Sequence, residues 1–252
     1  MRTPTNGLLT LAVAALFGWG PAQATPTVTA APPHSAGQVP LYPRLDKFPD
    51  TRIMAKVNAL LAAQEKTDRS ARTDCLSQLK DAGEKPAADS YSTEIAVTYL
   101  SLHFMSVNVV TGYDCGGPYP TNGAEAPVTF DLDTGSAIDW SKTFKPGFLP
   151  RDNADEAAPP SALTKLYRAR YPKGPDDADC RGAIAEQDPF ADPPAIWLDA
   201  KRGLVVEPSL PHAVAACADE LVLQPADLAL YLGNSTLKAD LVDKLASSSV
   251  RK

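Results

Sequence analysis

The residues best suited to chemistry gather in Asp131-Leu-Asp-Thr-Gly-Ser136, where two carboxylates lie two positions apart just before a glycine. Such a pattern opens calcium loops, but the hand-type loop needs glycine at position 6 and glutamate at position 12. Here position 5 is Gly135 and position 12 is Lys142. The spacing argues against calcium and favours an Asp-x-Gly turn between two strands.

The same segment resembles the Asp-Thr-Gly-Ser element of the aspartic proteases, and Tyr231-Leu-Gly233 resembles the hydrophobic-Gly element that follows it. That chemistry requires two carboxylates sharing one proton, and hence a second such turn or a homodimer. The chain has no second Asp-Thr-Gly. A secreted aspartic-protease-like hydrolase that uses Asp133 is therefore kept as the alternative function.

Other catalytic signatures are missing from the sequence. It contains no Gly-x-Ser-x-Gly, His-Glu-x-x-His, glycine-rich phosphate loop or Cys-x-x-Cys, so the sequence predicts no catalytic residue outside the Asp133 alternative, no metal and no cofactor. His103 lies in a strand-like run and is expected to be a packed or cross-strand residue rather than a general base.

A second segment, Tyr113-Asp-Cys-Gly-Gly-Pro-Tyr-Pro120, follows a long β-type run. Two glycines permit backbone angles that side chains forbid, and two prolines stiffen the exit. A rigid loop with an exposed aromatic loses little entropy on binding, so a ligand is expected to contact Gly116, Gly117, Pro118, Tyr119 and Pro120. The alternative is a simple turn with Tyr119 packed inward.

The N-terminus predicts export. Arg2 precedes a short apolar run, Leu8 to Phe17, and Ala22-Gln-Ala24 provides a cleavage site, so residues 1–24 are expected to be a signal peptide. No later stretch of the sequence is apolar for long enough to span a bilayer. The expected location is periplasmic or secreted, and the net charge of −6 argues against nucleic acid as a partner.

The four cysteines support this location. An even number of cysteines in an exported chain indicates disulfides, and neither their spacing nor the three histidines predict a metal site. Of three possible pairings, the sequential one is preferred: Cys75 with Cys115 and Cys180 with Cys217.

The elements that must position these residues come in separate helical and extended runs. Residues 25–43 are rich in Pro, Ala and Thr and are expected to form a flexible leader. Helical spacing follows Asp50 and recurs in four further regions. These helices are expected from Asp50 or Thr51 to about Leu61, over 70–82 and 161–170, from Pro225, and over 237–245.

Extended segments alternate with turns through the rest of the chain. They are expected as two strands within 91–113 that divide near 99–101, a strand at 128–132, a return at 137–140, a hairpin of 195–198 with 204–207, and a strand at 220–224. Residues 146–160 are expected to be a loop. Separate runs of helices and strands predict an α+β fold, with N-terminal helices packed on a mainly antiparallel sheet and two disulfides.

Several motifs, in this order, resemble the extracytoplasmic RsiV-like domain family. They are a Tyr-Pro start at 42–43, Val57-Asn58 in a helix, the Gly-Gly-Pro-Tyr-Pro loop, the Thr134-Gly135 turn, and Leu221-Val-Leu-Gln-Pro-Ala-Asp-Leu-Ala-Leu-Tyr-Leu232. This family occurs in RsiV-type anti-sigma factors, which sense lysozyme, and beside the catalytic domain of PdaC-type peptidoglycan deacetylases. The resemblance extends over about Leu41 to Leu232.

The resemblance implies a single RsiV-like α+β domain over 44–252, with an alternative division into two subdomains near 146–160. Too few residues precede the apolar run for a sigma-binding segment, and no deacetylase domain follows. The expected function is therefore an exported cell-envelope binding or sensing protein without catalytic activity. Its expected partner is a lysozyme-like protein, another envelope protein or a cell-wall glycan.

Overall fold

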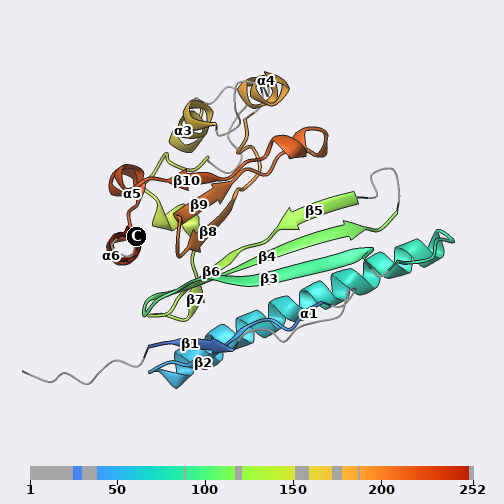
Figure 1. Ribbon diagram of the computed structural model, residues 1–252, viewed down its shortest axis with the longest axis horizontal. Helices are drawn as coiled ribbons and strands as arrows, with labels where there is room; N and C mark the ends of the chain where they lie inside the picture. The colour runs from blue at the N-terminus through green and yellow to red at the C-terminus, as the bar shows by residue number, and fades with distance from the viewer. Residues whose placement is uncertain are drawn as a thin grey trace, which may run out of the picture.

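The computed structural model describes residues 25–29, 39–87, 89–116, 121–150, 159–171, 178–186 and 188–249 (Figure 1). Helices and strands alternate in short groups along the chain. In order they are β1 (Thr27–Thr29), β2 (Arg44–Lys47), α1 (Thr51–Asp81), β3 (Tyr91–Leu100), β4 (Phe104–Asp114), β5 (Thr121–Glu125), β6 (Val128–Asp131), β7 (Ser136–Ala137), α2 (Trp140–Thr143), α3 (Ala162–Arg170), α4 (Ala178–Glu186), β8 (Ala195–Asp199), β9 (Gly203–Glu207), the 3-10 helix η1 (His212–Cys217), β10 (Leu221–Leu223), α5 (Pro225–Tyr231) and α6 (Ser235–Ser249).

Helix α1 is one continuous helix where the sequence predicted two. Asp50 caps it as expected, because its carboxylate accepts hydrogen bonds from the backbone N–H groups of Arg52 and Ile53. The stretch between the two predicted helices, residues 62–69, contains no glycine or proline and is rich in good helix formers, so nothing interrupts the helix there. It ends before Gly83, which has a φ of +78°.

The central sheet lies on α1 (Figure 1). Its strand order is β3-β4-β6-β7, with β5 also paired to β4, and all pairs are antiparallel. Alternate residues of β4 point to one face, so Met105, Val107 and Val109 share a buried cluster with Val57 and Leu61 of α1. The predicted division of 91–113 into two strands is confirmed.

A second antiparallel sheet, with order β10-β9-β8, packs on the other face of the central sheet. Thr98 Oγ1 donates to Leu198 O at 2.6 Å, and Leu198 N donates to Ser106 Oγ at 3.2 Å, so polar side chains join the two sheets. The far face of the second sheet buries Leu198, Leu204 and their neighbours against residues of α3, α5 and α6. The layers are therefore α1, central sheet, second sheet and C-terminal helices (Figure 1).

Several elements differ from the sequence predictions. Strand β5 was not expected, because Asn122 and Gly123 have low strand propensity, yet it pairs in register with β4. The expected return at 137–140 is short, since Asp139 caps helix α2 through its side chain. Helix α4, which contains Cys180, was not predicted. Strand β1 lies inside the predicted leader and pairs with β2.

The fold class predicted from the sequence is confirmed: helices and antiparallel sheets in an α+β arrangement, with both disulfides in the preferred pairing, Cys75 with Cys115 and Cys180 with Cys217. In the part of the chain that the structure describes, no helix is both long and apolar enough to cross a membrane. The predicted signal peptide, residues 1–24, lies outside the described residues.

Candidate functional site

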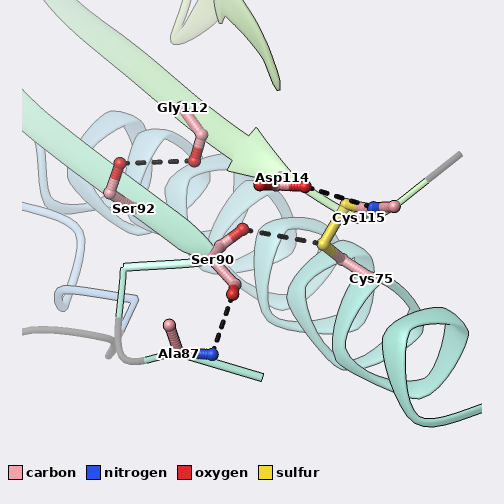
Figure 2. The surroundings of a disulfide bond; sticks show 8 residues. Cys75, Ala87, Ser90, Ser92, Gly112, Asp114 and Cys115 are labelled. Carbon is pink, nitrogen blue, oxygen red and sulfur yellow. Dashed lines mark hydrogen bonds between the residues drawn. A yellow bond between two sulfur atoms is a disulfide. The ribbon is translucent and has the colours of Figure 1, made fainter. Parts of the chain in front are cut away.

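The base of the glycine-proline loop is held by a disulfide at the end of β4. Cys115 is bonded to Cys75 near the end of α1, with a Cα–Cα distance of 4.8 Å (Figure 2). Asp114 N donates to Ser90 O at 2.8 Å, which adds a hydrogen bond from the start of β3. Helix, strand and loop therefore meet at one covalently fixed point.

Gly116 is the one predicted contact residue that the structure describes. Its φ is +78°, a conformation that favours glycine, and its N–H donates to Asp114 Oδ1 at 3.3 Å. A Cβ at this position would lie 3.4 Å from Leu79 Cδ2 of α1. Gly117, Pro118, Tyr119 and Pro120 lie outside the described residues.

The second disulfide joins α4 to η1. Cys180 and Cys217 have Cα atoms 5.2 Å apart and are both buried. Tyr171 Oη donates to Cys217 O at 2.9 Å, which connects the end of α3 to the same point. This pair stabilises the C-terminal half and lies on different elements from the glycine-proline loop.

The Asp131–Ser136 segment is a tight turn between β6 and β7. Asp131 Oδ1 accepts hydrogen bonds from Asp133 N at 2.8 Å and Thr134 N at 3.2 Å, and Gly135 has a φ of +68°. Lys56 of α1 donates to Thr134 O at 3.0 Å. These contacts account for the Asp-x-x-Thr-Gly pattern as a turn anchored to the helix.

Asp133 pairs with a histidine. His103 Nδ1 lies 3.0 Å and 3.1 Å from the two carboxylate oxygens of Asp133. Their side chains are 43% and 55% exposed, so His103 is in an exposed turn rather than packed within a strand. An aspartic-protease mechanism would need a second carboxylate beside Asp133. Among the described residues, the side chain that pairs with Asp133 is His103.

An open cleft lies beside this turn, with a volume of about 360 Å³. Asp131, Thr134, Asp139, Lys142 and Asn234 contribute to its lining. A hydrogen bond from Lys142, followed by one from Ser141, lowers the pKa of Asp139 to about 2. Asp139 and Lys142 therefore form an ion pair in the lining of the cleft, and Asp133 is not part of that lining.

A pair of carboxyl groups, Glu125 and Glu207, lies between the two sheets and was not predicted from the sequence. Burial, and then the charge and hydrogen bonding of Glu125, raise the pKa of Glu207 to about 8. Asn108 Nδ2 donates to Glu125 Oε2 at 3.3 Å. A signal was present in the sequence, since β3, β4 and β5 contain acidic residues but no lysine or arginine.

Comparison with solved structures gives distant likenesses. The crystal structure of a DUF3298 family member from Bacteroides fragilis is similar to this chain, with a TM-score of 0.48 and 13% identity, over 79% of this chain and 86% of that one. No protein-family model and no curated protein matches the sequence. At this score and identity the likeness assigns the chain no family and no function.

Proposed function

We propose that this protein is an exported cell-envelope binding protein without catalytic activity, whose ligand is a lysozyme-like protein or a cell-wall glycan. The observation that carries the proposal is the Cys75–Cys115 disulfide, which fixes the start of the glycine-proline loop to α1. The β4–β5 ladder continues to Asp114 and Thr121, so the connection between the strands is fixed at both ends. Fixed ends limit the conformations that a connecting segment can adopt before binding, which lowers the entropy lost on binding.

The two disulfides also support export, because such bonds persist in oxidising compartments outside the cytoplasm. The net charge of −6 favours a basic partner over an anionic one. The RsiV-like resemblance of the sequence adds the class of ligand. The disulfides thus support the proposed location, the net charge supports a basic partner, and the resemblance supports the proposed binding function.

Substitution of Tyr119 tests whether the loop is the contact surface. Surface plasmon resonance measures the binding of egg-white lysozyme and of soluble peptidoglycan fragments to residues 25–252, the expected mature chain. The melting temperature of each variant is measured separately. Tyr119→Ala is expected to weaken binding at least tenfold with an unchanged melting temperature, as for an aromatic contact residue. A lowered melting temperature with unchanged binding would show that Tyr119 packs inward and that the loop only turns the chain.

A further inference from the structure

One face of the central sheet is only partly covered. Polar contacts at Thr98 and Ser106 join it to the second sheet, but near the start of β3 the outward residues Glu94 and Ala96 are exposed, and Val110 of β4 is 38% exposed. Val110 lies opposite Glu94 on β3 and opposite Glu125 on β5. Directly paired residues share a face, so Glu94, Val110 and Glu125 form one row across three strands.

We call this row, together with Asn108 and the facing Glu207 of β9, the acidic face. Strands β3, β4 and β5 contain no lysine or arginine. Besides Glu125 of β5, the charges that raise the pKa of Glu207 are those of Glu220 and Asp219, which lie just before β10. Both are negative. The nearby cation Arg202 is already paired with Glu220 and Asp199.

Two acceptor atoms of the acidic face lack donors. Glu207 Oε2 and Asn108 Oδ1 are buried and accept no hydrogen bond from any residue that the structure describes. Glu125 lies within hydrogen-bonding reach of Glu207 but is itself a carboxyl group, so the pair is satisfied only if a proton is shared between them. Buried acceptors without donors cost free energy, and a lysine or arginine side chain supplies both donors and charge.

We propose that the acidic face docks a basic, extended segment of a partner protein, with a lysine or arginine side chain paired with Glu125 and Glu207. The proposal rests on the binding function proposed above and specifies the chemistry of the partner. Charge complementarity selects this occupant. A second copy of the chain would bring a like-charged face, and anionic lipid or nucleic acid would be repelled.

The charge state of the pair gives the interaction a pH dependence. Because the pKa of Glu207 is about 8, the carboxyl pair holds a proton at neutral pH. A paired cation would displace this proton, since it stabilises both ionised carboxylates. Affinity for a basic segment is therefore expected to rise between pH 6.5 and 8.5, where an ordinary surface carboxylate, already ionised, would give no change.

The test uses penta-lysine and the ¹⁵N-labelled mature chain, residues 25–252, at low ionic strength. The peptide is expected to shift the amide signals of Val110 and Glu125. Two variants should bind at least tenfold more weakly: Glu125→Gln/Glu207→Gln, and Glu94→Gln, whose exposed side chain makes misfolding an unlikely cause. The charge-matched control Asp74→Asn/Asp81→Asn changes exposed residues of α1 and should bind like the unmodified chain.

Three results would overturn the proposal: no binding of penta-lysine, shifts confined to other surfaces, or equal weakening by the control variant. These results are separable from failure of the proposed function, which is measured with lysozyme and peptidoglycan fragments. If lysozyme binds the chain and the Glu125→Gln/Glu207→Gln variant binds it equally well, the binding function stands and the acidic face is the wrong surface.

Discussion

Cys75 on α1 and Cys115 at the end of β4 are covalently joined, although they lie 40 positions apart in sequence. The bond connects the helical layer to the central sheet at the edge from which the glycine-proline loop departs (Figure 2). Tyr91 is buried in the same cluster, with Tyr113 packed beside it, so the disulfide is also part of a small apolar core. Stability and presentation of the loop therefore depend on the same bond.

Removal of this disulfide is expected to destabilise the fold and weaken ligand binding together. In the chain-entropy model the Cys75→Ser/Cys115→Ser variant loses about 3–4 kcal/mol in its free energy of unfolding, measured by urea denaturation. The matched control is Cys180→Ser/Cys217→Ser, which opens a similar loop of separation 37. The control should lose similar stability and keep its affinity at temperatures where it is folded. Equal loss of affinity in both variants would count against a role for the loop.

Glu207 is expected to make the fold less stable as pH rises. The folded protein keeps a proton on this carboxyl up to about pH 8, whereas the unfolded chain releases it near the ordinary value of 4.5. The folded state therefore binds more protons in this window, and the free energy of unfolding falls from pH 4.5 to pH 8. Glu207→Gln should raise the melting temperature at pH 8.5 by roughly 3 °C or more and change it little at pH 4. An equal change in melting temperature at both pH values would contradict the raised pKa of Glu207.

Asp227 is expected to be important for the C-terminal half. Its carboxylate, 5% exposed, accepts from Arg170 Nη1 at 2.5 Å and Nη2 at 3.0 Å and from Gln224 N at 2.8 Å. It thereby joins α3 to the start of α5. Asp227→Asn should lower the free energy of unfolding by about 1–3 kcal/mol, because a buried charge-assisted network is broken. Thermal denaturation of this variant is compared with that of the exposed Asp74→Asn control. Equal melting temperatures for the two variants would show that the network contributes little to stability.

The sequence was most informative where a local signal had a single physical meaning. Asp50 before an apolar helical pattern predicted the start of α1. Four cysteines in a chain that was expected to be exported predicted the two disulfides that are present. The elements that were missed depend on tertiary contacts. Strand β5 contains Gly123 and has weak strand propensity, and it is a strand because β4 offers it a free edge.

The candidate site was less predictable than the fold. Gly116 was identified from its residue type, and its positive φ explains why a glycine is needed there. The contact of His103 with Asp133 was not predicted, because it joins two turns that are 30 positions apart in sequence. The approach of Glu207 to Glu125 depends on how two sheets pack. No local pattern specifies that packing, so only the absence of basic residues in three strands pointed toward it.

The central claim is that the protein binds an envelope ligand, and isothermal titration calorimetry tests it most directly. The mature chain, residues 25–252, is titrated with egg-white lysozyme and separately with soluble peptidoglycan fragments. The account predicts saturable binding of at least one of them, with a dissociation constant of about 1 μM or tighter, equivalent to about −8 kcal/mol, and no turnover of the ligand. Absence of saturable binding to both, or hydrolysis of a ligand that Asp133→Asn abolishes, would contradict it.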